Sequence, residues 1–322
     1  MAAERVREAR RRAHLKERQA VSRRRQQRPL DPPSTVDASL WGRAPLTSAA
    51  LRVEKAREDA AKDERDEVRI RSVARSLTES QVRILEKGEH LGRGRYGSTT
   101  LVRWHGQAAV LKEATVHSKY VDFKDEFLTL CHLLGEGGAP LPLGLCRSPV
   151  AMVMSYVGSC TLAKALKRRT LSEAELLEVA ICLCRRVGEI QAKGVVHNDL
   201  KEDNIMVDDA QKVYLIDFGL ATREDEVVGY NVASGGAQWL APEIRRRGRS
   251  SFASDVYSVG RVLKHVYDAM SSTSDKFSAA IDGATSRASE ERPTVRELLA
   301  LLRDLRDSPD FEPEQFDSPS IF

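Results

Sequence analysis

The pattern of apolar and polar positions changes at about residue 86, where a charged stretch gives way to β-rich runs. Residues 87–114 combine such runs with glycine turns, which is typical of three antiparallel strands joined by hairpins. The runs LPLGLCRS and VAMVMSYV predict two further strands. Residues 119–134 carry apolar side chains at steps of four, three and four, which predicts one face of a helix: Phe123, Phe127, Leu130 and Leu134. The sequence therefore predicts a five-stranded antiparallel sheet with one helix.

After Gly158 the pattern becomes that of helices. A capping box begins at Ser172, and the apolar stripe behind it ends at Gly194, a residue suited to a left-handed helix stop. The other predicted elements are strands near 205–207 and 213–216, a helix over 253–270, and a helix capped at Thr294 that runs to about 306. The predicted fold class is α+β with two lobes, a sheet-containing lobe at about 86–157 and a mostly helical lobe at about 158–306.

The two ends of the chain differ in composition from this middle part. Residues 1–77 are charged and poor in apolar side chains, which predicts a largely disordered arm or a solvated helix. A capping box at Thr78 opens the folded domain, which we expect over residues 78–306. Residues 307–322 are acidic and punctuated by proline, which predicts a disordered tail.

The net charge of +4 is concentrated at the N-terminal end. Residues 1–30 hold 11 Arg or Lys against three Glu, so they carry +8 and the rest of the chain carries −4. Such an arm fits contact of residues 1–28 with nucleic acid or an acidic partner, and it equally fits a solvated tail with no partner.

The cysteines and the apolar runs bear on the compartment. The 5 cysteines show no metal-binding spacing, and no apolar run has the length of a signal peptide or a membrane span. We therefore expect a reducing compartment, the cytoplasm or the nucleus, and no membrane span.

Polar side chains gather in VVHNDLKEDNIMV, residues 195–207, just before a predicted strand. In a loop between a helix and a strand, Asp199, Lys201 and Asn204 can point into one pocket. The next strand ends at Asp217, and a small hairpin would bring this carboxylate beside Asn204. A carboxylate and an amide oxygen suit Mg²⁺. Asp199 can accept the proton of an attacking hydroxyl, while Lys201 neutralises charge on a moving phosphoryl group.

A second group of candidates lies in the first lobe. The run GRGRYG places Gly92, Gly94 and Gly97 on a predicted strand–turn–strand. This context argues against a dinucleotide-binding turn; it fits a plain hairpin, or a flap whose backbone N–H groups cover phosphates. Lys112 ends the strand AVLK, and Glu126 follows on the helix, so this pair can hold an ammonium group over a phosphate.

In this order, the motifs GRGRYG, AVLK, helix Glu, HNDLKEDN, DFG, APE, DVYSVG and Arg-Pro resemble the eukaryotic protein kinase family over roughly residues 86–306. The resemblance implies a bilobal fold, ATP and Mg²⁺ as cofactors, and a protein substrate phosphorylated on Ser or Thr. It implies Asp199 and Lys201 as catalytic residues, with Asn204 and Asp217 holding Mg²⁺. The residues implied to bind the nucleotide are Gly92, Gly94, Gly97, Val110, Lys112, Glu126, Met154, Tyr156, Val157 and Met206.

The resemblance also implies residues that support the site. Asp255 would brace the catalytic loop from below, and Glu243 would pair with Arg292. His197 and Phe218 would belong to an apolar spine that links the lobes.

One departure from the family pattern concerns activation. Asn198 stands where the family usually has an arginine that receives a phosphorylated activation loop. A neutral amide cannot form that charge-assisted pair. We therefore expect that phosphorylation of Thr222, Tyr230 or Ser234 is not an obligatory switch.

Another departure concerns the acceptor. Gly236 stands where Ser/Thr kinases usually carry a threonine that braces the catalytic lysine and aspartate. Trp239 resembles the tyrosine-kinase version of this loop, whereas Lys201 resembles the Ser/Thr version. Two alternatives therefore stay open: a tyrosine or dual-specificity kinase, and a pseudokinase-like scaffold that binds nucleotide or partner proteins with little transfer.

Overall fold

A computed structural model describes most of the chain between residues 48 and 308. The described ranges are 48–94, 97–115, 119–228, 237–271 and 274–308. The basic arm 1–28, the tail from 309 onwards, and Tyr230, Ser234 and Gly236 lie outside them. The chain divides into two units, Met1–Asp59 and Ala60–Phe322. Helix α2 (Ser48–Val73) spans this boundary.

The first lobe is built on a sheet of six strands in the order β1-β5-β6-β4-β3-β2. The strands are β1 (Arg75–Leu77), β2 (Lys87–Arg93), β3 (Gly97–Trp104), β4 (Gln107–Ala114), β5 (Pro142–Cys146) and β6 (Ala151–Ser155). The five predicted strands are all present and antiparallel, but β1 adds a sixth that runs parallel to β5. Leu77 packs so closely on Gly144 that a Cβ there would meet its side chain at 2.7 Å.

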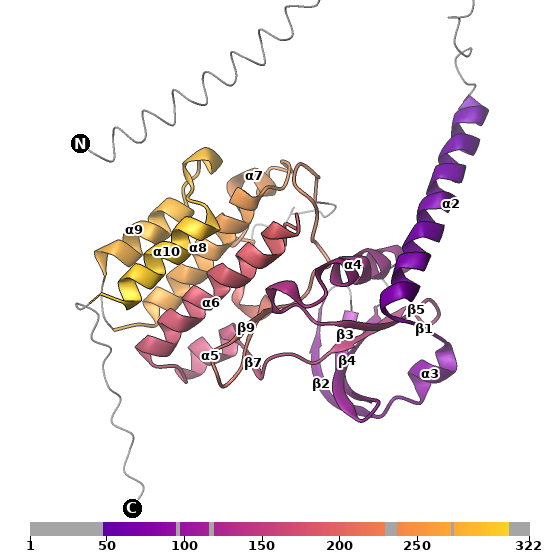
Figure 1. Ribbon diagram of the computed structural model, residues 1–322, viewed down its shortest axis with the longest axis horizontal. Helices are drawn as coiled ribbons and strands as arrows, with labels where there is room; N and C mark the ends of the chain where they lie inside the picture. The colour runs from indigo at the N-terminus through magenta and orange to yellow at the C-terminus, as the bar shows by residue number, and fades with distance from the viewer. Residues whose placement is uncertain (1–47, 95–96, 116–118, 229–236, 272–273, 309–322) are drawn as a thin grey trace, which may run out of the picture. The chain divides into compact units, whose positions relative to one another are not determined.

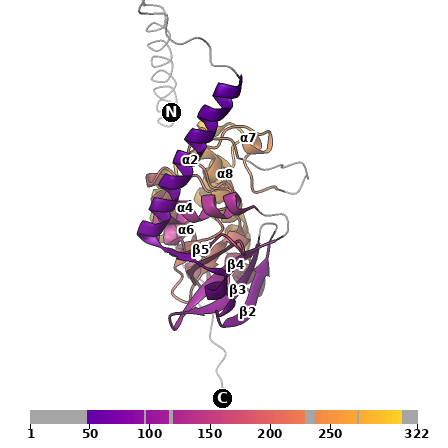
Figure 2. The same cartoon turned by 90° about the vertical axis from the view of Figure 1, so that its right-hand side faces the viewer.

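Helix α4 (Tyr120–Leu133) packs on β5 and β6 and faces the helical lobe (Figures 1 and 2). Its Phe123, Phe127 and Leu130 are buried as predicted. Leu134 departs from the predicted face, because it caps the helix in the left-handed conformation (φ 48°) and is 56% exposed. The predicted capping box at Thr78 opens the short helix α3 (Glu79–Arg83).

The second lobe is mostly helical (Figure 1). Its helices in the described ranges are α5 (Leu162–Arg168), α6 (Glu173–Ala192), α7 (Pro242–Arg245), α8 (Phe252–Asp268), α9 (Asp275–Ala284) and α10 (Val295–Arg306). The capping boxes at Ser172 and Thr294 form as predicted, and Gly194 takes the left-handed conformation after α6 (φ 75°). A small sheet of β7 (Cys160–Thr161), β8 (Ile205–Val207) and β9 (Val213–Leu215) lies beside them. The two-lobed α+β fold is therefore confirmed.

None of the helices in the described ranges combines the length and the apolar character needed to cross a membrane.

Candidate active site

Lys112 on β4 joins both lobes at the centre of the site. Its Nζ lies 2.8 Å from each carboxylate oxygen of Glu126 on α4 and 3.0 Å from Oδ1 of Asp217, which follows β9. Strands β3 and β4 approach closely at this point: a Cβ on Gly97 of β3 would meet Lys112 Cγ at 3.0 Å. The sequence therefore predicted three side chains that do meet, from a strand, a helix and a loop.

The protonation of this cluster follows from its charges. Burial alone lowers the pKa of Lys112, but the nearby carboxylates of Glu126 and Asp217 outweigh it and raise the pKa above the ordinary lysine value. The ammonium charge of Lys112 in turn lowers the pKa of Asp217. Lys112 is therefore a cation and Asp217 an anion at neutral pH.

The loop between α6 and β8, in the helical lobe, carries Asp199. Oδ2 of Asp199 accepts hydrogen bonds from Lys201 Nζ at 2.7 Å and from Asn204 Nδ2 at 2.8 Å. Asn204 Nδ2 also donates to the backbone oxygen of Asp199 at 2.9 Å. The side chain of Asp199 is 10% exposed. The predicted carboxylate, cation and amide therefore form one connected group.

Asn204 and Asp217 lie at the two open ends of the β8–β9 hairpin. Ile205 pairs with Leu215 in this hairpin, and Ile216 N donates to the backbone oxygen of Asn204 at 3.0 Å. Because Asn204 commits its amide nitrogen to Asp199, its carbonyl oxygen is the atom left to bind a cation. Together with the anionic Asp217, it offers the hard oxygen donors that suit a divalent ion with few protein ligands.

Asp255 on α8 supports the loop from beneath. Its carboxylate accepts the backbone N–H groups of His197 (2.7 Å) and Asn198 (2.9 Å), as the resemblance implied. The His197 ring accepts from Asp199 N through Nδ1 and contacts Ile216 O through Nε2. Burial lowers the pKa of His197, so the imidazole is neutral and structural. It lies 4.6 Å from the buried Phe218 ring, between centroids.

Asn198 connects this loop to the segment that follows Asp217. Its φ of 63° is in the left-handed region, which asparagine tolerates better than most residues. Its Nδ2 donates to Leu220 O at 3.1 Å and to Thr222 Oγ1 at 2.8 Å, and Thr222 in turn contacts Ser250 at 2.6 Å. A neutral amide therefore holds the start of this segment through hydrogen bonds.

The other residues expected around the nucleotide lie on β2, β3, β4, β6 and β8 and on the segments that follow β2 and β6. Val110 on β4 pairs with Met154 on β6, and the partly buried Tyr156 and Val157 follow this strand. Met206 lies opposite on β8, so close to Gly158 that a Cβ there would meet it at 2.6 Å. Gly92 and Gly94 lie at the β2–β3 turn, where Gly94 N donates to Gly97 O at 2.8 Å.

Two further contacts involve the segment around α7, and the sequence predicted only one of them. Arg292 makes the predicted two-pronged pair with Glu243, at 2.6 and 2.8 Å. Trp239 Nε1 donates to Oδ1 of Asp199 at 2.9 Å, which sequence reasoning missed. No spacing rule links two residues 40 positions apart, so only the folded structure reveals this contact.

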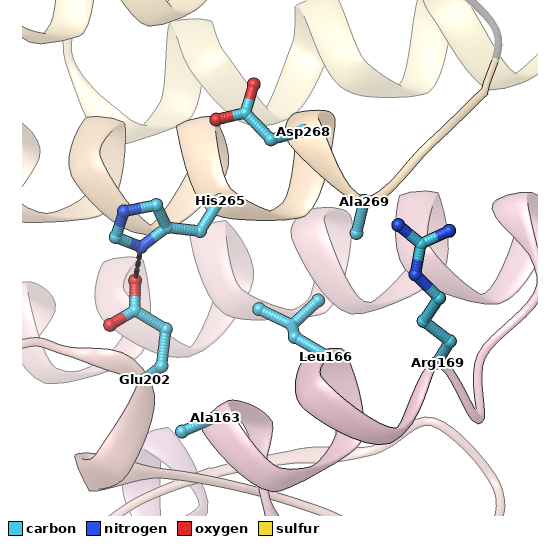
Figure 3. Close-up of a pocket in the computed structure, with 7 residues that line it drawn as sticks. All are labelled: Ala163, Leu166, Arg169, Glu202, His265, Asp268 and Ala269. Carbon is cyan, nitrogen blue, oxygen red and sulfur yellow. Dashed lines mark hydrogen bonds and ion pairs between the residues drawn. The ribbon is translucent and has the colours of Figure 1, made fainter.

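A hollow of about 400 Å³ lies behind the loop in the helical lobe, as Figure 3 shows. Glu202 points from the loop between α6 and β8 toward His265 of α8, with which it forms a hydrogen bond. The other residues that line the hollow are Ala163, Leu166, Arg169, Asp268 and Ala269. The loop is therefore tied to α8 at Glu202 as well as through Asp255.

Comparison with known proteins agrees with this geometry. The family model described as "Protein kinase domain" matches residues 85–278, more than half of the chain. Similar proteins include serine/threonine-protein kinase CTR1 of Arabidopsis thaliana, 28% identical over 54% of this chain and 23% of the relative. They also include the megakaryocyte-associated tyrosine-protein kinase of Mus musculus, 28% identical over 57% of this chain and 36% of the relative.

A third relative is Kinase suppressor of Ras 2 of Homo sapiens, 30% identical over 55% of this chain and 21% of the relative. The match covers less than two fifths of each of these relatives. The family model covers the part of this chain that carries the site. Fold, site geometry and family match agree. The chain belongs to the protein kinase family.

Proposed function

We propose that this protein transfers the γ-phosphoryl group of ATP to Ser or Thr hydroxyls of protein substrates. The observation that carries the proposal is the convergence on Lys112, which reaches Glu126 and Asp217 within 3.0 Å. The loop that carries Asp199 and Asn204 lies next to this cluster, because Asn204 and Asp217 flank the β8–β9 hairpin. A phosphoryl-transfer site needs a positioned cation, a base and oxygen ligands for a metal, and these residues supply them.

The roles of the polar residues follow from their contacts. Lys112, held by Glu126, binds the α- and β-phosphates. Asp199 accepts the proton of the acceptor hydroxyl, and Lys201 neutralises charge on the phosphoryl group in flight. Asn204 and Asp217 hold Mg²⁺, which shields the phosphate charges when bound.

The remaining residues enclose the nucleotide. The glycine-containing turn between β2 and β3 covers the phosphates. Side chains of β4, β6 and β8, and of the segment that follows β6, contact the adenine ring. These nucleotide-binding residues are Gly92, Gly94, Gly97, Val110, Met154, Tyr156, Val157 and Met206.

Purified protein tested with γ-labelled ATP and Mg²⁺ against mixed Ser/Thr and Tyr peptides decides the acceptor. We favour Ser/Thr because Lys201 lies beside the base, although the relatives include both kinds of kinase. Asp217→Asn is the control, since it removes the negative charge of a proposed metal ligand. Label on tyrosine peptides alone would contradict the Ser/Thr assignment.

Asp199→Asn tests the base directly. Positioned general-base catalysis contributes about 10²–10⁴-fold, so turnover should fall by about that factor. ATP binding should stay nearly unchanged, because the proposed nucleotide contacts lie elsewhere. Equal turnover in both proteins would remove Asp199 from this role.

We also propose that the protein is active without a phosphate on residues 222–234. The support is the neutral network in which Asn198 holds Leu220 O and Thr222 Oγ1. Protein shown by mass spectrometry to carry no phosphate should keep full turnover. Activity that appears only after phosphorylation of Thr222, Tyr230 or Ser234 would contradict this.

A scaffold with little transfer is the second candidate. Three donors occupy Asp199, and Lys112 points its Nζ at three carboxylate oxygens, so both groups have partners within the protein. A rise in melting temperature with ATP and Mg²⁺, without labelled phosphate on any peptide, would select this function.

A further inference from the structure

The orientation of the Asp199 carboxylate depends on a residue from a separate segment. Oδ2 accepts hydrogen bonds from Lys201 and Asn204, which belong to the same loop. Oδ1 accepts its hydrogen bond from Trp239 Nε1, in the turn before α7. Within the described ranges, Trp239 is the one side chain from outside the loop that donates to this carboxylate.

Trp239 is itself held from two sides. Its backbone oxygen accepts a hydrogen bond from Ser258 Oγ at 2.7 Å, and Ser258 is buried on α8. Its side chain packs on the small buried cluster of Leu240, Ala241 and Ile244. The indole is therefore a supported group whose position is set by α7 and α8, the helices that also carry Glu243 and Asp255.

The indole ring contacts the second polar group of the loop as well. Lys201 Nζ lies 4.8 Å from the centroid of the Trp239 ring, within cation–π range. One side chain thus touches both the base and its neighbouring cation. The terminal torsion of an aspartate is otherwise broad, so a carboxylate held at one oxygen alone can turn.

We propose that Trp239 is the positioning residue of the catalytic base. Its N–H takes one lone pair of Asp199 Oδ1 and leaves the other for the acceptor hydroxyl, while its ring keeps Lys201 beside the transferred phosphoryl group. This inference rests on the proposed function, in which Asp199 is the base. It adds a residue from the turn before α7 to the machinery of the catalytic loop.

Kinetics of Trp239→Phe and Trp239→Leu in the full chain test the role. Phenylalanine keeps a ring near Lys201 and loses the N–H, so kcat should fall by about 10- to 100-fold, the value of one hydrogen bond to a charged group. Leucine loses both the N–H and the ring, so the kcat of Trp239→Leu should fall further than that of Trp239→Phe. KM for ATP should stay within about twofold for both, which separates positioning from a general loss of structure.

Trp104→Phe is the matched control, because Trp104 lies at the end of β3, outside the site. It should leave kcat unchanged. A kcat for Trp239→Phe equal to that of wild type would overturn the positioning role, and a higher kcat would show that the indole obstructs the base instead.

The contact also has a readout that does not need activity. In ¹⁵N-labelled protein, Asp199→Ala should shift the indole N–H signal of Trp239 upfield and speed its exchange with water, while the signal of Trp104 stays in place. An unmoved Trp239 signal would overturn the inference. If the wild-type protein transfers no phosphate, the proposed function fails and the positioning role fails with it. If the wild-type protein transfers phosphate and the Trp239 variants do so equally well, the proposed function stands and the inference alone fails.

Discussion

Two buried lysines of the first lobe, Lys112 on β4 and Lys124 on α4, make similar contacts with different consequences. Their side chains are 9% and 6% exposed, and each pairs with two carboxylates. Lys112 pairs with Glu126 and Asp217. Lys124 pairs with two carboxylates of α2, Asp63 at 2.5 Å and Asp66 at 3.1 Å.

The difference lies in what surrounds each cluster. Asp217 follows β9 and lies at the same end of the hairpin as Asn204. The Lys112 cluster therefore lies next to other groups that are suited to bind phosphate and metal. The Lys124 cluster joins α4 to α2, together with the hydrogen bond from Tyr120 to Glu67 at 3.2 Å and the buried Ile70. A buried ion pair is therefore a sign of chemistry only where further reactive groups converge on it. The Lys124 cluster fixes α4, the helix that presents Glu126.

Lys112→Met should have the largest effect. It removes the cation that we propose to bind phosphate, so kcat should fall by about 10²–10³-fold, as for the loss of one electrostatic donor. It also leaves the buried Glu126 unpaired, which should cost about 3–5 kcal/mol of unfolding free energy. Denaturant unfolding and peptide phosphorylation measure the two losses separately.

The double variant Lys112→Met/Glu126→Gln sharpens this result. Neutralising Glu126 removes the unpaired charge, so stability should partly recover while activity does not. If activity returned together with stability, Lys112 would be as architectural as Lys124.

Ile70→Ala tests the apolar part of the α2 contact. Ile70 is 2% exposed and belongs to the same buried cluster as Phe123 and Phe127 of α4. The truncation should lower the unfolding free energy by about 2–5 kcal/mol. Val68→Ala is the matched control on the same helix, because Val68 is exposed, and it should stay within about 0.5 kcal/mol of wild type.

The sequence predicts the Lys112 cluster far better than the Lys124 cluster, for a physical reason. Lys112, Glu126 and Asp217 each occupy a short motif whose chemistry demands that residue type. Asp63 and Asp66 lie in a stretch so rich in charge that any two carboxylates look alike. Only the fold selects the pair that meets Lys124.

The fold shows the same division between local and distant signals. The caps at Ser172 and Thr294 and the hairpin of β8 and β9 were predictable, because each depends on residues a few positions apart. Strand β1 was not, since three residues are too few to show alternation and its partner β5 lies far along the chain. The contact of Trp239 with Asp199 was missed for the same reason.

Lys124→Met should be milder than either change above. Of its two partners, Asp63 is largely exposed and can return to water, and only Asp66 is left mostly buried without its cation, so we expect a loss of about 1–2 kcal/mol in unfolding free energy. Turnover should fall by less than about tenfold, through looser placement of Glu126. Lys87→Met is the matched control, because the pair of Lys87 with Glu113, at 2.8 Å, is exposed and should be worth about 1 kcal/mol or less. Equal losses in both variants would remove the distinction between the buried and the exposed lysine.

The smallest effect should appear in the pH dependence of stability. The hydrogen bond from Lys124, and then its charge, lower the pKa of Asp63 below the ordinary value of 3.8. A depressed carboxyl pKa contributes stability above 3.8 that is lost as pH falls through the lowered value, because the unfolded chain binds the proton first. Between about pH 5 and 2, the unfolding free energy should therefore fall slightly more steeply with decreasing pH for wild type than for Asp63→Asn. A wild-type curve parallel to that of Asp63→Asn would mean that the Lys124 pair adds no stability in this pH range.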